Sequence, residues 1–293
     1  MRSAKAGPPN CFAEGVHVPM QAEKAARFKA LHQGPDVLVI ANPWDAGSAR
    51  LLAGLGFKAL STTSAGLAFS LGRRDGTASV SRAEALANAR SIAEATSLPV
   101  AADLENGYGD SPEAAAETIR LAAETGGLCG GSIEDASGDP GHPIYDFQLA
   151  VERVAAAAAA ARALPFPFMF VARAENYLHG RPDLDDTIRR LQAYEAAGAE
   201  VLYAPGITRA EDIRTVCASV SKPVNVLVGL KEGPQLSVSD LGALGVRRIS
   251  LGSGFSRAAM TAFYRAGREV IDHGTFEFAA ETFYMSELVD LFG

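Results

Sequence analysis

The chain has 293 residues, of which 48% are hydrophobic and 21% charged, and its formal net charge is -7. This length allows one large α/β domain or two smaller ones. The acidic balance argues against nucleic acid and anionic membranes as partners, because both need a basic face that neutralises phosphates. The short basic pairs, Arg73 with Arg74 and Arg247 with Arg248, do not change that conclusion.

The three cysteines, Cys11, Cys129 and Cys217, are far apart and form no CxxC motif. This usage is typical of a reducing compartment, so we expect a cytoplasmic protein. No apolar run approaches the roughly 20 residues of a membrane span, and no signal-peptide segment is evident. We expect residues 1–20 to be a loose extension and residues 21–293 to form a single domain with a C-terminal helical tail.

Eight short apolar runs alternate with Ala-rich stretches of helix length; the runs begin at Val37, Ala59, Pro99, Gly130, Phe168, Val201, Pro223 and Arg247. Continuous apolar runs are typical of strands buried on both faces, as in a parallel sheet covered by helices. Amphipathic segments between them, such as 81–97, 111–127 and 184–200, carry Ser or Asp caps and end near Gly.

Eight such βα units in one chain favour a closed (β/α)8 TIM-type barrel over an open doubly wound sheet. The first expected strand is followed by "ANPWDAGSARLL", which contains neither GxGxxG nor GxxxxGK. The dinucleotide-binding and P-loop interpretations therefore lose support.

Acidic residues lie at the ends of three of the first four runs. Asp103 and Glu105 close the third run, Glu134 and Asp135 close the fourth, and Asp75 follows the second. In such barrels the chemistry lies at the carboxyl ends of the strands. Buried carboxylates need a cation or hydrogen-bond donors, so this pattern predicts a hard metal ion. Asp103, Glu105 and Glu134 are a suitable ligand set for magnesium, with Asp103 and Glu105 expected on one side of one strand. Zinc is disfavoured, because no His or Cys lies at ligand spacing. The alternative to a metal site is that one or more of these carboxylates pairs with an arginine or caps a helix.

Arg173 ends the fifth run, where its planar fork is suited to a substrate carboxylate or phosphonate. A salt bridge to Glu175 or Glu134 is the alternative, and both roles are compatible. Asn225 is expected after the seventh strand, either donating to a substrate carboxylate or capping its loop.

The segment "STTSAG" offers the hydroxyls and backbone amides of Thr62, Thr63 and Ser64 to an anionic group, although turn chemistry alone also explains it. His142 lies on the loop after the fourth strand. We expect either a mobile acid or base there, or an inert surface histidine.

Five motifs, "NPWDAGSARLL", "TTSAGLAFSLGRRDG", "AADLENGYGD", "GGSIEDASGDPGH" and "FVARAENYLHGR", resemble in order and spacing the isocitrate lyase and phosphoenolpyruvate mutase superfamily. The resemblance covers roughly residues 25–255. It implies an eight-stranded barrel whose last helix is swapped between subunits, usually in a homotetramer built as a dimer of dimers. It also implies Mg2+, with Mn2+ as a possible substitute, which binds a 2-oxo acid and stabilises an enolate formed by breaking a C–C or P–C bond.

The resemblance also assigns roles by position. It implies that Asp103 binds the metal directly and that Glu105 and Glu134 reach it mainly through water. The other implied roles are a carboxylate near the reacting centre, substrate binding by a side chain and by a backbone segment, and a supporting side chain: Asp75, Arg173, residues 62–64 and Asp45.

Two departures bear on the reaction. Lyases that cleave isocitrate or methylisocitrate carry a "KKCGH" or "KRCGH" loop, whereas this chain has "SGDPGH", with Pro140 in place of the Cys and Gly141 and His142 retained. Those lyases also place a Glu after the Pro that ends the sixth strand, but Gly206 follows Pro205 here. Proline cannot transfer a proton, so the isocitrate-type reaction loses its protonating group. The Lys and Asn of the mutase branch are missing as well.

The leading hypothesis is therefore a magnesium-dependent lyase or hydrolase that cleaves a C–C bond of a small 2-oxo or 2-hydroxy carboxylate, such as an oxaloacetate-like compound, through an enolate. Asp75 or a residue of the 136–146 loop handles the proton in this hypothesis. One alternative is phosphonate chemistry of the phosphoenolpyruvate mutase or phosphonopyruvate hydrolase type. Another is a catalytically silent protein that binds 2-oxo acids.

Overall fold

The structure, a computed structural model, describes residues 20–125 and 127–292. The extension expected over residues 1–20 and Cys11 lie outside the described residues, except for Met20, which precedes the first helix.

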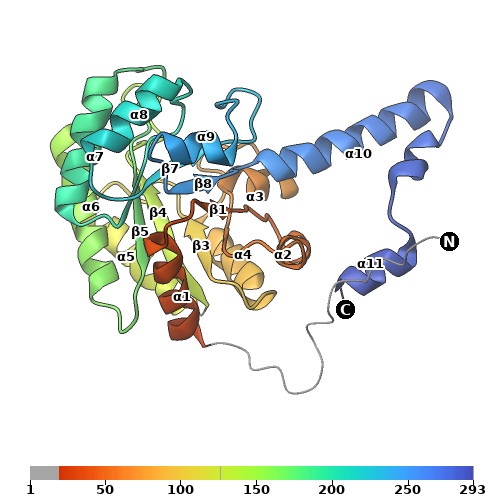
Figure 1. Ribbon diagram of the computed structural model, residues 1–293, viewed down its shortest axis with the longest axis horizontal. Coiled ribbons are helices and arrows are strands. Elements are labelled where there is room, and N and C mark those ends of the chain that lie inside the picture. Colours follow the sequence, from red (N-terminus) through yellow and green to blue (C-terminus); the bar gives the residue numbers. More distant parts are fainter. Residues whose placement is uncertain (1–19, 126, 293) are drawn as a thin grey trace.

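The chain alternates strands and helices, as the sequence predicts (Figure 1). The strands are β1 (Leu38–Ile40), β2 (Leu60–Ser61), β3 (Val100–Asp103), β4 (Leu128–Glu134), β5 (Met169–Arg173), β6 (Val201–Tyr203), β7 (Val224–Leu227) and β8 (Arg248–Ser250). The helices are α1 (Gln21–Gln33), α2 (Ala46–Gly54), α3 (Ser64–Ser70), α4 (Arg82–Glu94), α5 (Pro112–Glu124), α6 (Phe147–Arg162), α7 (Leu184–Ala197), α8 (Ala210–Ser219), α9 (Val238–Ala243), α10 (Gly254–His273) and α11 (Met285–Phe292), with a 3-10 turn η1 (Glu277–Glu281).

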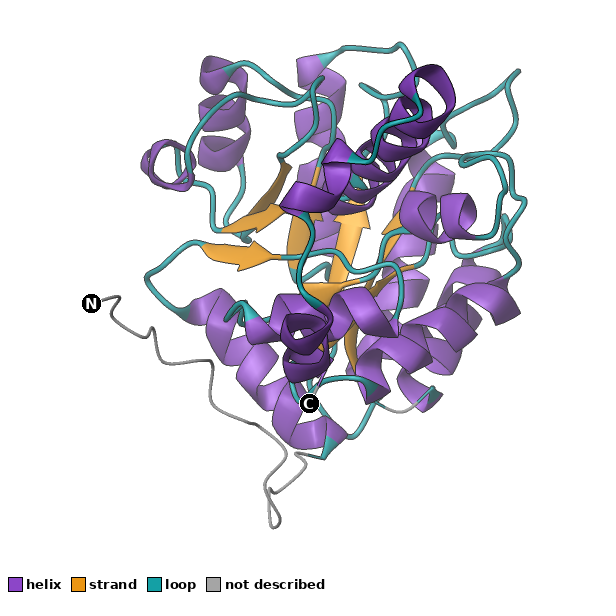
Figure 2. Cartoon of the chain, turned by 90° about the vertical axis from the view of Figure 1, so that its right-hand side faces the viewer, coloured by secondary structure: helices purple, strands orange, loops and turns teal. Residues whose placement is uncertain are grey.

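All eight strands form one parallel sheet in the order β1-β8-β7-β6-β5-β4-β3-β2. A parallel bridge between Ala41 and Leu60 links the first strand to the second and closes the barrel. Figure 2 shows the strands in the centre with helices around them. The predicted (β/α)8 barrel is confirmed.

The helices begin where the sequence places caps. The side chain of Ser81 accepts from Glu84 N before α4, Ser111 accepts from Ala114 N before α5, and Asp183 accepts from Asp186 N before α7. These contacts satisfy amides that have no partner within the helix.

A small inner core fills the amino-terminal half of the barrel. Phe28 of α1 is fully buried there. It packs in one cluster with Ala59, which precedes β2, and with inward-facing strand residues: Leu38, Ile40, Ala101, Cys129, Met169, Val171 and Val201. Helix α1, which contacts β4 and β5, therefore covers the amino end of the barrel. The carboxyl ends of the strands remain for the chemistry.

One interior row of side chains crosses six strands. Its members are partners in register around the barrel, in the order Glu134, Arg173, Tyr203, Asn225, Arg248 and Leu38. Partners in neighbouring parallel strands point to the same face, and Leu38 belongs to the inner core, so the whole row faces the interior. Because barrel strands are staggered, this row runs from the carboxyl end of β4 to the amino end of β8.

The C-terminal segment departs from the predicted single helical tail. Helix α10 projects away from the barrel (Figure 1), and the chain then forms η1 and α11 instead of one helix. Thr282, at the break, has an extended backbone, and this β-branched residue and the aromatic Phe283 and Tyr284 that follow it are weaker helix formers than Ala or Leu. Helix α11 contacts α2 of the same chain, and Arg50 Nη1 donates to Phe292 O at 3.0 Å. The swap of this segment between subunits stays a prediction.

Within the described residues, no helix combines the length and the apolar character that crossing a membrane requires.

Candidate active site

Three carboxylates surround the guanidinium of Arg173 at the end of β5. Its Nη1 lies 2.9 Å from Asp103 Oδ1, and its Nη2 lies 2.9 Å from Glu134 Oε2 and 2.8 Å from Glu175 Oε1. The predicted salt bridges from Arg173 to Glu134 and Glu175 are both present. Burial lowers the pKa of Arg173, but Glu134, Glu175 and Asp103 raise it well above its ordinary value.

The loop that follows β2 holds Asp103 in place. Ser64 N donates to Asp103 Oδ2 at 3.1 Å, and Asp103 N donates to Thr62 Oγ1 at 2.9 Å. Thr63 Oγ1 accepts from Gly66 N at 3.3 Å and caps α3. The structure thus brings residues 62–64 to Asp103, with the Thr62 and Thr63 hydroxyls engaged by the protein itself.

Glu105 does not lie on the strand as predicted. Strand β3 ends at Asp103, and Gly107 N donates to Leu104 O at 2.8 Å in the turn that follows. Glu105 occupies this turn with a left-handed φ of +47°, a backbone conformation that is uncommon for residues other than Gly, Asn or Asp. The turn nevertheless keeps the carboxylate at the mouth. Burial, followed by the charges of Asp103 and Asp75, raises the pKa of Glu105 to about 7.

Asp75 comes to the same mouth from the loop after α3. Although this residue is exposed, partial burial of its carboxyl and the charge of Asp103 raise its pKa, against a smaller effect of Arg173. Burial likewise raises the pKa of Glu134, and Arg173 opposes that rise.

The mouth therefore holds an excess of negative charge. Within the part of the chain that the structure describes, five carboxylates interact with one another and share a single cation, Arg173; they belong to Asp75, Asp103, Glu105, Glu134 and Glu175. Oxygen-only donors of this kind fit a hard divalent ion. Across residues 20–125 and 127–292, however, no three acidic, His or Cys side chains already converge as a ligand set. The arrangement fits an ion that keeps several waters, as magnesium does, better than an all-protein cage.

His142 is not brought to this cluster. Its side chain is 89% exposed, on the loop between β4 and α6, and its Nδ1 lies 3.3 Å from Asp139 Oδ2. The loop is pinned at its base by a bridge between Ala136 and Ile144. In this conformation His142 matches the surface alternative, and Pro140 is exposed beside it.

The prediction that Asn225 follows the seventh strand is wrong. Asn225 is the second residue of β7, because the apolar run continues through Leu227, and the residue is 2% exposed. Its Nδ2 donates to Ser250 Oγ at 2.9 Å inside the barrel. Asp45, assigned to a supporting role, caps α2 by accepting from Ser48 N at 2.7 Å.

Sequence reasoning missed the role of Asp135, which it grouped with the mouth carboxylates. Asp135 is 3% exposed; its Oδ1 accepts from Glu175 N at 2.7 Å, and its Oδ2 accepts from Tyr194 Oη at 2.5 Å and Arg190 Nη1 at 3.0 Å. Glu134 ends β4 and Asp135 is the next residue, and side chains alternate in direction along an extended chain, so the "ED" pair itself carries the signal. Glu134 faces Arg173, and Asp135 ties the backbone of Glu175 to α7.

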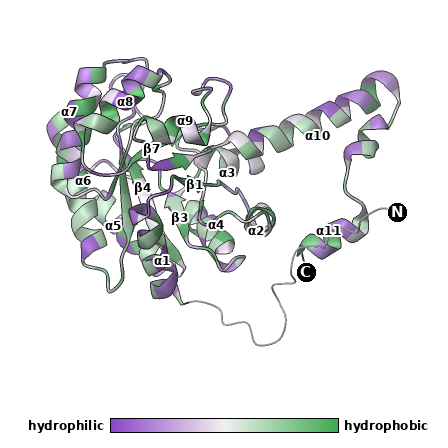
Figure 3. Ribbon diagram, in the orientation of Figure 1, coloured by the Kyte–Doolittle hydropathy of each residue, from purple (hydrophilic) through white to green (hydrophobic). Residues whose placement is uncertain are grey.

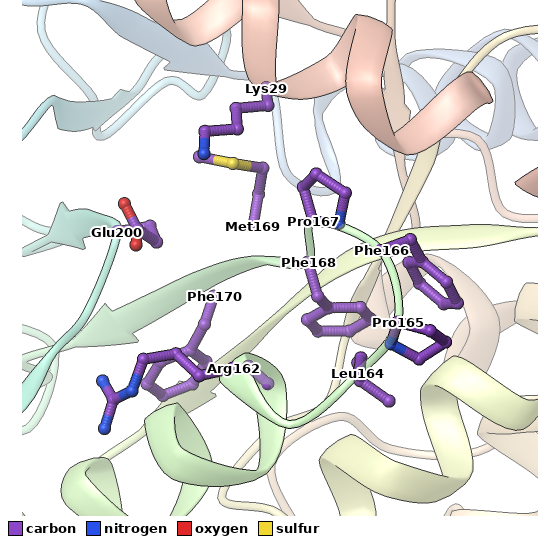
Figure 4. A pocket seen from close by; sticks show the side chains of 11 residues that line it. Lys29, Arg162, Leu164, Pro165, Phe166, Pro167, Phe168, Met169, Phe170 and Glu200 are labelled. Atoms are coloured by element: carbon purple, nitrogen blue, oxygen red, sulfur yellow. The ribbon is translucent and has the colours of Figure 1, made fainter. Parts of the chain in front are cut away.

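The hollows near these residues are small. One beside Asp103 and Glu105, also lined by Tyr108, has a volume of about 10 Å3, which is room for a single water. A larger pocket of about 340 Å3 lies at the opposite end of the barrel, between Lys29, the loop before β5 and Glu200 (Figure 4). That pocket is remote from the carboxylates.

Comparison with known proteins agrees with the fold and the motifs. The family model "Phosphoenolpyruvate phosphomutase" matches residues 28–271. A solved structure titled as a putative lyase/mutase from Burkholderia cenocepacia is 55% identical, with a TM-score of 0.90, covering 93% of this chain and 96% of the other.

Two curated proteins are more distant relatives. An uncharacterised protein of Mycobacterium tuberculosis is 33% identical over 84% of this chain and 89% of its own length. A protein of Bradyrhizobium diazoefficiens named oxaloacetate decarboxylase is 31% identical over 70% of this chain and 71% of its own length.

Proposed function

Because this chain belongs to the phosphoenolpyruvate phosphomutase family, within the superfamily of isocitrate lyases and phosphoenolpyruvate mutases, we propose a specific reaction class. The protein is a divalent-metal-dependent lyase or hydrolase that cleaves a C–C bond of a small 2-oxo or 2-hydroxy carboxylate. Members of the superfamily are lyases or mutases that act on small carboxylates and phosphonates.

The observation that carries the proposal is the charge imbalance at the carboxyl ends of the strands. Five interacting carboxylates share one arginine, and such a cluster is stable only with added positive charge or added protons. Asp103, Glu105 and Glu134 would hold Mg2+, or Mn2+ in its place, with Asp103 bound directly. When bound, the ion supplies positive charge where negative charge develops on the 2-oxo oxygen of the substrate.

The protein's own groups have separate tasks in this reaction. Arg173 binds a substrate carboxylate. The backbone of residues 62–64, which lies beside Asp103, helps to hold the substrate. For an oxaloacetate-like substrate the C3–C4 bond breaks, carbon dioxide leaves, and the electron pair forms an enolate. Asp75 or a residue of the 136–146 loop then delivers a proton to C3.

The departures at two positions support this class over isocitrate cleavage. Pro140 cannot donate a proton, and Gly206 replaces the glutamate that follows the sixth strand in those lyases. The relative named oxaloacetate decarboxylase supports a small 2-oxo dicarboxylate as substrate.

A turnover screen tests the proposal. Purified protein is incubated with 2-oxo and 2-hydroxy di- and tricarboxylates, with magnesium or with EDTA, alongside Asp103→Ala. We expect a pyruvate-type product from one compound with magnesium only, and none from Asp103→Ala. A control is Glu94→Ala, an exposed carboxylate that pairs with Arg90 of the same helix and lies outside the proposed site, which should retain activity.

Two other outcomes identify the alternatives. Conversion of phosphonopyruvate, followed by phosphorus NMR, would assign phosphonate chemistry instead. Metal-dependent thermal stabilisation by a 2-oxo acid, with no turnover over hours, would assign a binding protein.

We also infer that the C-terminal segment joins copies of this chain. Large apolar side chains of α10 and the residues after it are exposed, among them Phe263, Ile271, Phe283, Tyr284 and Met285. The green bands of α10 and α11 in Figure 3 show this apolar character, and α10 projects away from the barrel. Light scattering should find an oligomer, a tetramer by family resemblance, and Phe263→Glu with Ile271→Glu should yield smaller species.

A further inference from the structure

A second arginine, Arg248, lies inside the barrel. Arg248 is the first residue of β8; it is 4% exposed, and its Nε and Nη1 have no hydrogen-bond partner in the described chain. In the interior row it lies between Leu38 and Asn225. Removing a guanidinium from water without compensation costs several kcal/mol, so a structure that keeps one must compensate it.

The groups around Arg248 are neutral. Asn225 is 2% exposed and its Oδ1 is unpartnered, while its Nδ2 donates to Ser250 Oγ. His32 of α1 is close enough to Arg248 to be affected by its charge; it is 7% exposed, its Nδ1 contacts Phe28 O at 2.8 Å, and its Nε2 has no hydrogen-bond partner among the described residues. We call this set, Arg248, Asn225, Ser250 and His32, the inner chamber.

The pKa shifts of Arg248 and His32 agree with their burial in the inner chamber. Burial lowers the pKa of Arg248 to about 10, and the Tyr203 phenol is the group that opposes the shift. The guanidinium therefore stays protonated at neutral pH. Burial, and then the charge of Arg248, lowers the pKa of His32 to about 3, so His32 stays neutral. The inner chamber therefore carries one net positive charge, that of Arg248.

We propose that the inner chamber is a binding site for a small monovalent anion of the halide class, held by Arg248. The donors are Arg248 Nε and Nη1. Rotation of the Asn225 amide adds Asn225 Nδ2 as a donor while its oxygen accepts from the Ser250 hydroxyl. Amide oxygen and nitrogen exchange places without a change of shape.

The residues of the site are enclosed. Each of Arg248, Asn225 and His32 is more than nine-tenths buried, and Phe28 of α1 is fully buried in the core at the amino end of the barrel. Such burial favours a small anion over a metabolite with several carboxylates. The site therefore differs in ligand and in position from the carboxylate cluster at the mouth, and it does not depend on the proposed reaction.

Thermal stability in different salts tests the site. The melting temperature is measured in potassium chloride, bromide and gluconate at equal ionic strength, for the wild type, Arg248→Met and Arg247→Met. Arg247 is the matched control, because it precedes Arg248 in sequence but is exposed and donates to Pro35 O at 2.8 Å.

Halide at about a hundredfold excess over its Kd should raise the wild-type melting temperature over gluconate by on the order of 5 °C. Arg247→Met should keep this difference, and Arg248→Met should lose it. An equal halide effect in wild type and Arg248→Met would overturn the proposal.

Crystals of the wild type grown in bromide provide a readout that does not need a folded variant. We expect an anomalous peak within hydrogen-bonding distance of Arg248 Nε or Nη1. A chamber that contains only water at saturating bromide would refute the anion site.

Discussion

Replacing Asp135 by asparagine preserves the shape of the side chain and removes its charge. Three donors point at this carboxylate: Glu175 N at 2.7 Å, Tyr194 Oη at 2.5 Å and Arg190 Nη1 at 3.0 Å. An amide offers one oxygen and places a donor at the other position. In Asp135→Asn, either the backbone of Glu175 or the pair of donors from α7 faces an N–H group.

The loss of stability in Asp135→Asn follows from the burial of this carboxylate and its partners. Asp135 and Arg190 have side chains 2% and 9% exposed, so solvent does not replace the lost contacts. Each hydrogen bond to a charged group contributes about 1.5–3 kcal/mol, and breaking one partner of a buried pair costs about 3–5 kcal/mol. Arg190 keeps Asp186 Oδ2 at 2.8 Å and Tyr145 O at 3.2 Å. We therefore expect Asp135→Asn to lower the free energy of unfolding by about 3 kcal/mol, the lower end of the range for a broken buried pair.

Urea denaturation followed by circular dichroism measures the change in the free energy of unfolding. Asp186→Asn is the control, because Asp186 binds the same arginine but its side chain is 23% exposed. A partly solvated pair of this kind contributes about 1 kcal/mol or less. Tyr194→Phe, which removes one donor and no charge, should fall between the two variants.

The reasoning fails if Asp135→Asn and Asp186→Asn lose equal stability. Such a result would mean that burial does not decide the strength of these contacts. Non-additive losses in Asp135→Asn with Tyr194→Phe would support the direct contact between the two side chains.

Three further predictions concern the barrel and its mouth. Burial lowers the pKa of His32 from 6.5 to about 3, so its contribution to stability is present above pH 6.5 and is lost as the pH falls toward 3. In halide-free buffer, the free energy of unfolding should fall between pH 7 and pH 5, and this fall should be about 2 kcal/mol larger in the wild type than in His32→Leu. Gly130→Ala should lower the melting temperature strongly, because its Cβ would lie 2.5 Å from Met169 O, whereas Gly54→Ala, with nothing within 4 Å, should be nearly neutral. Arg173→Lys should reduce kcat/KM for the identified substrate by at least about tenfold, since lysine lacks the fork that binds carboxylates; an unchanged value would remove Arg173 from the proposed site.

Much of the fold is determined by local patterns. Each of the eight apolar runs overlaps a strand, and Ser81 and Ser111 cap helices as predicted, because strand burial and helix capping depend on residues close in sequence. The carboxylates at the ends of the third and fourth runs also follow from the barrel rule, and the Arg173 salt bridges were among the predicted alternatives.

Only the tertiary structure decided the depth of each side chain. Asn225 and Arg248 look from the sequence like strand-end and basic-pair residues, yet the stagger of the barrel places both in the interior row. Register between strands depends on packing across the whole sheet, which no local pattern encodes. The same is true of Glu105, which a left-handed turn returns to the mouth, and of His142, which its loop leaves in solvent. The sequence alone thus determined the barrel and the carboxylates at the ends of its strands, whereas strand stagger and loop conformation determined which charged side chains meet at its mouth.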